Sequence, residues 1–251
     1  MGSAKELQPA SQEASRFAEK VSRMRSVVES EQIGQMSLMD GMYEEDKDYQ
    51  ALRNINTVAA PVQDKLESHG IYRRFWPVTV DSIDQRGVPQ QCRKQWHDVK
   101  EYIYRLSKYV QSGTGLMLVG PVGTMKTTMA IAVLREYVDA HGAGYFIPMV
   151  SLLDNLSQSR ERHDNSLEIR IRQTPLLVLD DLGAEYDHTW VQAKVDAIIT
   201  ERYNRLRATI VTSNLSAKDI RDRYQLRIFD RLRATNKLIA FRGTSLREIV
   251  K

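Results

Sequence analysis

The sequence is poor in cysteine and has no long hydrophobic run. Cys92 is the single cysteine among 251 residues, which excludes an internal disulfide and a cysteine-based zinc site. No stretch approaches the roughly 18 consecutive apolar residues of a membrane-spanning helix. The opening residues, MGSAKELQPASQEASRF, lack the apolar core of a signal peptide. From these absences we expect a reducing, cytoplasmic setting without a membrane partner.

Charge of one sign is in only slight excess. The 36 lysines and arginines against 32 acidic residues give a formal net charge of +4, and 42% of the residues are hydrophobic. This composition can bury a core. The basic balance is compatible with nucleic-acid binding, but ordinary solubilising charge explains it equally well. No internal repeat or low-complexity tract occurs.

The first part of the chain has helical patterns and no neighbouring strand pattern. Apolar residues at helical spacing predict an amphipathic helix over residues 11–33, followed by an acidic stretch at 39–50 and a short helix to about 58. The aromatic- and Pro-containing segment SHGIYRRFWPVTVDSID (68–84) reads as a connector. We therefore predict a helical region over 1–68, a candidate docking arm for a partner, and a second domain over 69–251.

The second domain alternates apolar strands with helices. Strands are predicted at 116–119, 144–150, 175–181, 208–214 and 237–241, and helices at 90–111, 127–141 and 190–206, with a capping box at 216–219. This alternation predicts an α/β fold with a five-stranded parallel sheet covered on both faces. The residues expected to face the core from two of these helices are Cys92, Trp96, Val99, Ile103, Leu106 and Val110, and Val191, Val195, Ile198, Ile199 and Leu206.

A glycine-containing loop follows the first strand and opens a helix. It reads GPVGTMKTT, and its candidate phosphate-binding residues are Gly120, Pro121, Val122, Gly123, Thr124, Met125, Lys126, Thr127 and Thr128. Backbone N–H groups at a helix amino terminus bind phosphate oxygens. Lys126 is suited to the outer phosphates of ATP, and Thr127 to Mg²⁺. A plain strand–helix turn with a surface lysine is the simpler reading, and the strand–loop–helix context disfavours it.

Met125 stands where the usual phosphate-binding pattern has glycine before the lysine. A side chain there restricts the backbone if the replaced glycine had a positive φ. The backbone N–H remains, so the anion-binding chemistry is retained. We therefore hypothesise that ATP still binds, with altered affinity or turnover.

Two further strands end in polar residues. LLVLDDLGAE (176–185) places Asp180 and Asp181 at a strand end. We expect Asp180 to hold Mg²⁺ and Asp181 to orient an attacking water, with Glu185 in a supporting role. A helix cap explains paired aspartates in isolation. TIVTSN (209–214) ends in Asn214, whose amide suits the same water. Simple strand-end capping is the alternative.

Arg227 and Arg231 are four residues apart in LRIFDRLR (226–233), and therefore share one helical face. A salt-bridged surface helix and an arginine finger that enters a neighbouring subunit's ATP site both fit this spacing.

Together these stretches resemble the AAA+ ATPases of the DnaC/DnaI helicase-loader and IstB transposition-helper group. The resemblance runs from about residue 71 to 247. It includes IYRRFWPVTVDSID, GPVGTMKTT except at Met125, LLVLDDLGAE, TIVTSN, RIFDRL and FRGTSLR. The group has a Walker A loop, a Walker B strand, a sensor 1 strand and an arginine-finger segment in this order.

The resemblance implies an open αβα sheet and ATP-driven assembly into a homo-oligomer. It implies Arg227 as the finger acting on a neighbour, with Arg231 beside it at the subunit interface. It also implies contact with single-stranded DNA and with a DnaB-type replicative helicase. The amino-terminal region departs from some loaders, because it has no cysteine cluster for a zinc-bound docking domain.

Three functions remain open from the sequence. The leading one is an ATP-hydrolysing helicase loader in DNA replication. The second is a transposition helper that assembles on duplex DNA and directs a transposase, and the third is a nucleotide-gated binding module with little hydrolysis.

The segment 157–173, with Arg160, Arg162, His163, Arg170 and Arg172, is a candidate DNA-backbone contact. A solvated surface helix explains it equally well.

Overall fold

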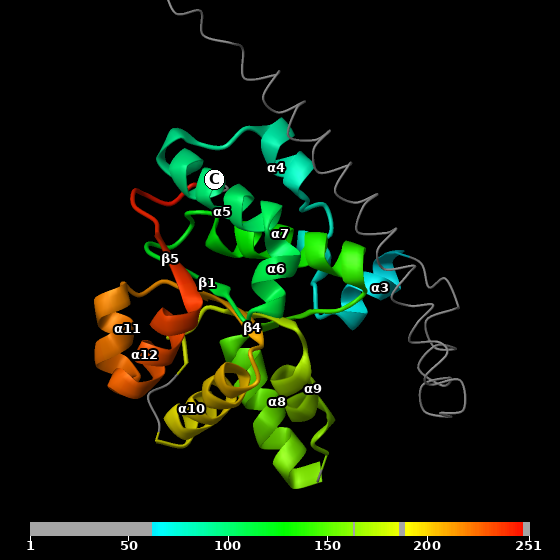
Figure 1. The fold of residues 1–251 in the computed structure, drawn as a ribbon, viewed down its shortest axis with the longest axis vertical. Coiled ribbons are helices and arrows are strands. Elements are labelled where there is room, and N and C mark those ends of the chain that lie inside the picture. Colours follow the sequence, from blue (N-terminus) through cyan, green and yellow to red (C-terminus); the bar gives the residue numbers. More distant parts are fainter. Residues whose placement is uncertain (1–61, 163, 186–188, 248–251) are drawn as a thin grey trace, which may run out of the picture. The chain divides into compact units, whose positions relative to one another are not determined.

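The computed structural model describes residues 62–162, 164–185 and 189–247 (Figure 1). The helix predicted over 11–33, the acidic stretch at 39–50 and the short helix to about 58 lie outside these ranges. Residues Val62–Lys251 form one compact unit. This unit begins seven residues before the boundary expected from sequence. None of the helices in the described ranges is long and apolar enough to span a bilayer.

The elements of this unit alternate along the chain as the sequence predicts. In order they are α3 (Val62–Ser68), η1 (Arg73–Phe75), α4 (Val80–Arg86), η2 (Gln90–Cys92), α5 (Arg93–Tyr104), α6 (Leu106–Gln111), β1 (Gly115–Val119), α7 (Lys126–His141), β2 (Tyr145–Pro148), α8 (Met149–Arg162), α9 (Ser166–Gln173), β3 (Leu176–Asp180), α10 (Thr189–Asn204), β4 (Ala208–Ser213), α11 (Ala217–Arg223), α12 (Gln225–Thr235) and β5 (Asn236–Ala240).

The predicted five-stranded parallel sheet is confirmed, with strand order β2-β3-β4-β1-β5. β1, β3 and β4 are buried along their whole length. Because both faces of such strands are covered, their sequences are largely apolar and do not alternate with exposed polar residues. The order puts β4 between β1 and β3. The carboxyl ends of β1, β4 and β3 therefore lie side by side at one edge of the sheet. These ends carry the phosphate loop, Asn214 and the Asp180–Asp181 pair respectively.

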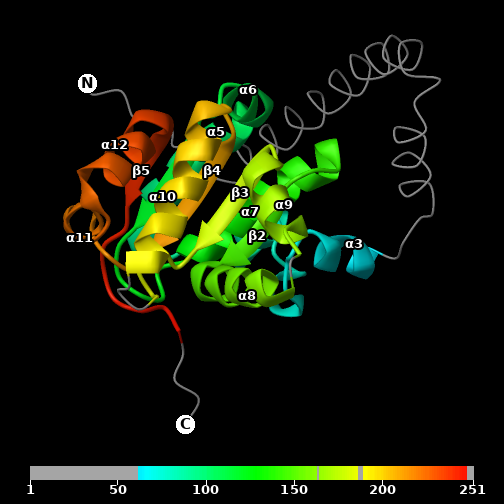
Figure 2. The same ribbon diagram turned by 90° about the horizontal axis from the view of Figure 1, so that it is seen from below.

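Helices cover both faces of the sheet. Figure 1 shows α5, α6 and α7 on one side and α8, α9 and α10 on the other, with α11 and α12 near β5; Figure 2 shows the same layers from below. Met117, Leu177 and Val211 point from neighbouring strands into the core beneath the second group of helices. The core therefore consists of two layers on one rigid sheet.

A predicted helix and a predicted strand have different bounds in the structure. The helix expected at 90–111 is divided into α5 and α6 at Arg105, whose φ of −115° and ψ of 23° are not helical. Its predicted apolar stripe is confirmed, since all six residues are buried. The strand expected at 144–150 ends at Pro148, because α8 begins at Met149.

Leu206 was expected to face the core, and this prediction is wrong. α10 ends at Asn204, and Leu206 has a positive φ of 51° in the turn that follows. The side chain is 59% exposed. The apolar spacing continued past the end of the helix, and the change of backbone direction turned this leucine to solvent.

The segment at 68–84 is more ordered than a connector. It contains η1, and α4 begins with a capping box in which Thr79 and Ser82 bond reciprocally to each other's backbone N–H. Ile71 is fully buried and accepts a hydrogen bond from Trp76 Nε1. Tyr72 and Phe75 pack edge-on against Phe146 of β2. The segment is thus part of the α/β unit and covers its β2 edge.

Candidate nucleotide-binding site

The loop after β1 turns directly into α7. Gly120 and Gly123 have φ of 135° and 77°, a region that L residues rarely adopt. A Cβ on Gly123 would lie 2.1 Å from Ser245 Oγ, so a larger residue is also excluded by contact. Thr124 Oγ1 donates to Pro121 O at 2.8 Å and closes the loop from within.

Met125 adopts a left-handed backbone conformation, which is the conformation that favours glycine. Its φ is 68° and its ψ is 10°, and it is the N-cap residue of α7. A non-glycine residue in this region costs about 1–2 kcal/mol relative to ordinary backbone. The loop therefore keeps the backbone path of a glycine at this position. The consequence of Met125 is strain and bulk, without loss of the turn.

Lys126 is buried at the start of α7. Its Nζ donates to Gly120 O at 2.8 Å, to Pro121 O at 2.6 Å and to Asn214 Oδ1 at 2.9 Å. Burial lowers the pKa of Lys126, while the charges of Asp181 and Asp180 act in the opposite direction and that of Arg247 adds to the lowering. The ammonium is thus held between the loop and the carboxyl ends of β3 and β4.

Asp180 lies opposite Thr127. Its Oδ1 accepts hydrogen bonds from Thr127 Oγ1 at 2.8 Å and Thr212 Oγ1 at 2.6 Å. Burial raises the pKa of the Asp180 carboxyl, and these hydrogen bonds partly oppose that rise. Hydroxyl and carboxylate oxygens are ligands that Mg²⁺ prefers. This donor pair therefore fits an ion held jointly by the protein and by nucleotide phosphates.

Asp181 follows the strand in a sharp turn. Its φ is 56°, and its backbone N–H donates to Thr212 Oγ1 at 3.0 Å. Its carboxylate accepts from Asn214 Nδ2 at 3.0 Å. Asn214 therefore joins Lys126 to Asp181, accepting from one and donating to the other. The structure brings the predicted Lys126, Asp181 and Asn214 into one hydrogen-bonded group.

Glu185 has a different place from the other acidic residues. Its Oε2 accepts from Gly183 N–H at 2.9 Å, and its Oε1 lies 3.9 Å from Arg223 Nε of α11. The backbone oxygen of Glu185 also accepts from Arg223. This buried residue therefore closes the loop after β3 and links that loop to α11.

The segment after β5 contacts the phosphate loop, and the sequence did not predict this contact. Leu246 N–H donates to Gly123 O at 2.9 Å, and Gln91 Nε2 donates to Thr244 O at 2.8 Å. The FRGTSLR stretch therefore holds the phosphate-loop backbone. Thr212 was also missed. Spacing could not reveal either, because both contacts join segments that are far apart in sequence.

Arg227 and Arg231 lie on α12 beside Asp196 of α10. Arg231 Nη1 is 3.2 Å from Asp196 Oδ1, and Arg227 Nε is 3.7 Å from the same oxygen. The shared helical face expected from their spacing is thus observed, with a carboxylate between them.

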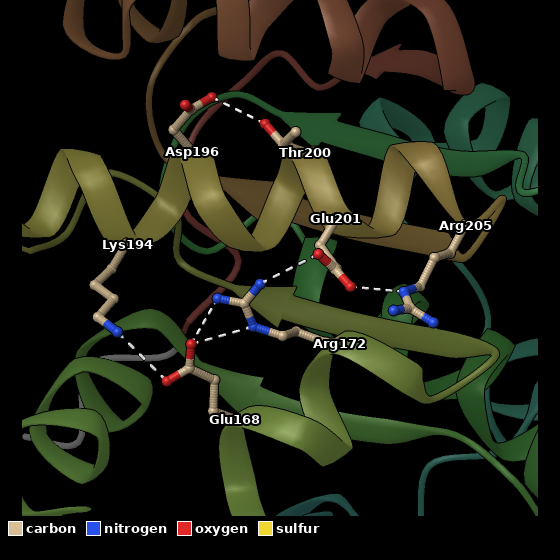
Figure 3. Close-up of polar contacts among 7 residues, drawn as sticks. All are labelled: Glu168, Arg172, Lys194, Asp196, Thr200, Glu201 and Arg205. Atoms are coloured by element: carbon tan, nitrogen blue, oxygen red, sulfur yellow. Dashed lines mark hydrogen bonds and ion pairs between the residues drawn. The ribbon is translucent and has the colours of Figure 1, made fainter. Parts of the chain in front are cut away.

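In the basic segment at 157–173, Arg170 and Arg172 bond to other residues of the chain. Figure 3 shows Arg172 between Glu168, which is also in α9, and Glu201 of α10. Arg172 Nη2 is 2.6 Å from Glu168 Oε1, and Arg172 Nη1 is 3.6 Å from Glu201 Oε2. Arg170 donates to Ser68 O and stacks over Tyr145. The side chains of Arg160 and Arg162, and all of His163, lie outside the described residues. The guanidinium of Arg172 is thus paired with carboxylates of two helices.

Residues 15–250 match the family model of the IstB-like ATP binding protein. The replicative helicase loader DnaI of Bacillus subtilis (strain 168) is 28% identical over 116 residues, which cover 45% of this chain and 37% of that protein. This chain thus spans well under two thirds of the DnaI sequence.

Two further relatives cover more of the chain. The insertion sequence IS21 putative ATP-binding protein of Pseudomonas aeruginosa is 26% identical over 180 residues, or 68% of this chain and 65% of that protein. The crystal structure of the DnaC helicase loader matches with a TM-score of 0.62 at 26% identity, covering 68% of this chain and all of the solved one. Both groups anticipated from the motifs are therefore represented among the relatives.

Proposed function

Because the chain belongs to the IstB-like ATP-binding protein family, we propose that it binds ATP with Mg²⁺ at the loop 120–128 and hydrolyses it. The observation that carries this proposal is the hydrogen-bonded group at the sheet edge. There Lys126, Asp181 and Asn214 are linked through the Asn214 amide. Such a group joins a phosphate-binding cation to a carboxylate suited to orient water.

Each residue in the site has a distinct role in this proposal. The loop backbone and the amino end of α7 bind the phosphates, and Lys126 neutralises the outer ones. Thr127 and Asp180 hold Mg²⁺, which when bound lowers the energy of charge that develops on the phosphate oxygens. Asp181 orients the attacking water and Asn214 holds that water in place. Met125 preserves the loop path, so ATP binding is retained.

A second copy of the chain completes the site. In the proposed homo-oligomer, Arg227 reaches the ATP of a neighbouring subunit, and Arg231 lies beside it at the interface. A guanidinium supplied by a neighbour stabilises the transition-state charge of phosphoryl transfer. The side chain of Arg227 is 63% exposed, which supports its contact with a neighbouring subunit.

The biological role proposed is the loading of a DnaB-type replicative helicase, with contact to single-stranded DNA. The similarity to the DnaC and DnaI helicase loaders supports it. An IS21-type transposition helper, which assembles on duplex DNA and directs a transposase, is the second candidate. The family match over 15–250 and the Pseudomonas aeruginosa relative favour that alternative.

An ATPase assay with and without single-stranded DNA tests the chemistry. The parent should hydrolyse ATP, Arg227→Ala should bind nucleotide but lose at least about a hundredfold in rate, and Lys126→Ala should lose nucleotide binding. Tight ATP binding without hydrolysis in the parent would instead identify the nucleotide-gated module.

Partner identity needs a separate experiment. Co-elution with a replicative hexameric helicase supports the loader, whereas ATP-dependent filaments on duplex DNA support the transposition helper. Performing both with Asp180→Asn shows whether the interaction depends on Mg²⁺–ATP. Failure of both assays in the parent would refute both roles while leaving the ATPase chemistry intact.

A further inference from the structure

Asp196 of α10 holds the two arginines of α12. Arg231 Nη1 donates to Asp196 Oδ1 at 3.2 Å. Arg227 Nε lies 3.7 Å from the same oxygen, beyond ordinary hydrogen-bond distance. One carboxylate with two guanidinium groups leaves a net charge of +1. The cluster of Asp196, Arg227 and Arg231 can therefore still attract a phosphate.

The two arginines differ in freedom. The Arg231 side chain is 20% exposed, and its guanidinium carbon lies 6.0 Å from the centre of the Tyr203 ring. The Arg227 side chain, one helical turn earlier, is 63% exposed. Arg231 is thus fixed against α10, while Arg227 extends from the same anchor towards solvent.

Asp196 is itself fixed on a well-packed helix. Thr200 Oγ1 donates to Asp196 Oδ1 at 3.2 Å, and Figure 3 shows both residues on the side of α10 away from Lys194 and Glu201. Neighbouring Val195 and Ile199 are buried in the core. Ile228 and Leu232 bury the inner face of α12. The carboxylate therefore belongs to a rigid part of the fold and can define where the arginines lie.

We propose that Asp196 is a positioning residue that anchors Arg231 and thereby directs Arg227 towards the phosphates bound by a neighbouring copy. This inference rests on the proposed function. The rate of hydrolysis falls steeply when a long side chain that must meet a phosphate across an interface is misplaced by about 1 Å. A fixed carboxylate beneath the arginine pair reduces that freedom before the subunits meet.

A mixed-subunit assay tests this proposal. Asp181→Asn makes a donor that cannot hydrolyse its own ATP but presents Arg227. Arg227→Ala makes an acceptor that retains its own hydrolytic residues. Each variant alone should be inactive, and their mixture should recover hydrolysis. Adding Asp196→Asn to the donor should lower the recovered rate by about tenfold or more, whereas adding it to the acceptor should change it by less than about twofold.

The matched control is Asp222→Asn in the donor, which removes an exposed aspartate paired only with its neighbour in sequence, Arg221, among the ion pairs of the described residues. It should leave the recovered rate unchanged. Equal losses from Asp196→Asn on donor and acceptor would indicate a folding role and overturn the inference. An unchanged rate with the Asp196→Asn donor would also overturn it. No recovery in the starting mixture would instead refute the shared ATPase site, and the positioning role with it.

Discussion

The hydroxyl of Thr212 joins the two aspartates at the end of β3. It donates to Asp180 Oδ1 at 2.6 Å and accepts the Asp181 N–H at 3.0 Å. A single β4 side chain therefore sets both the orientation of the predicted magnesium ligand and the sharp turn that directs Asp181. Loss of a partner that orients a metal ligand typically costs about 10- to 100-fold in metal affinity or activity.

We predict that Thr212→Val weakens Mg²⁺-dependent ATP binding by about tenfold and destabilises the fold by about 1–2 kcal/mol. Valine retains the shape but leaves the Asp181 N–H without this acceptor. Nucleotide titration with and without Mg²⁺, combined with urea unfolding, measures both effects. Thr212→Ser keeps the hydroxyl and should stay near the parent; an unchanged Mg²⁺–ATP affinity in Thr212→Val would show that the hydroxyl does not orient the aspartates.

Met125→Gly and Met125→Ala should differ in stability. Both remove the thioether side chain, but alanine keeps a Cβ at a φ of 68°, whereas glycine does not. We expect the glycine variant to be the more stable by about 1 kcal/mol, after the higher entropy of its unfolded chain is included. Denaturant unfolding of the two variants measures the difference. A more stable alanine variant would contradict strain at this position.

Asp180→Asn should separate folding from magnesium binding. Burial raises the pKa of Asp180 in the folded chain. Its ionisation therefore disfavours the fold: the penalty begins as pH rises past the unfolded pKa and is complete above the folded one. Without nucleotide at neutral pH, Asp180→Asn should melt at or above the parent temperature, and this advantage should disappear at acidic pH.

Mg²⁺–ATP should reverse that order. The parent should gain thermal stability on binding, while Asp180→Asn should gain much less because a magnesium ligand is missing. Melting curves at several pH values with and without Mg²⁺–ATP provide the measurement. An equal ligand-induced shift in both proteins would remove Asp180 from the metal site.

Arg172→Ala should affect stability and leave DNA binding unchanged. Burial alone would raise the pKa of Glu168, but the Arg172 hydrogen bond and the Lys194 charge outweigh it, so the net pKa is lowered. This pairing stabilises the fold above the unfolded pKa and is lost as pH falls through the folded one. We expect a loss of about 1 kcal/mol at neutral pH.

The control for this network is Arg205→Ala, whose side chain is 55% exposed although it also pairs with Glu201. It should cost less than Arg172→Ala because solvent screens the pair. Fluorescence anisotropy with single-stranded DNA at several salt concentrations completes the test. A shallower salt dependence for Arg172→Ala would mean that this arginine contacts phosphate after all.

The parallel sheet and the order of the site motifs along the chain could be predicted from the sequence. The apolar runs LMLV and LLVL predict strands that are covered on both faces. Gly120, Gly123 and Lys126 mark a phosphate loop because a tight turn, close backbone approach and a cation are needed together. These features are local in sequence, and local chemistry predicts them.

Which side chains meet could not be predicted from the sequence, because it depends on how the elements pack. The strand order placed β4 between β1 and β3, which brought Asn214 between Lys126 and Asp181 and Thr212 onto Asp180. The packing of α12 on α10 put Asp196 beside Arg227 and Arg231, and the end of α10 left Leu206 exposed to solvent. Such contacts join residues distant along the chain, and they depend on strand order, helix ends and packing that residue spacing does not contain.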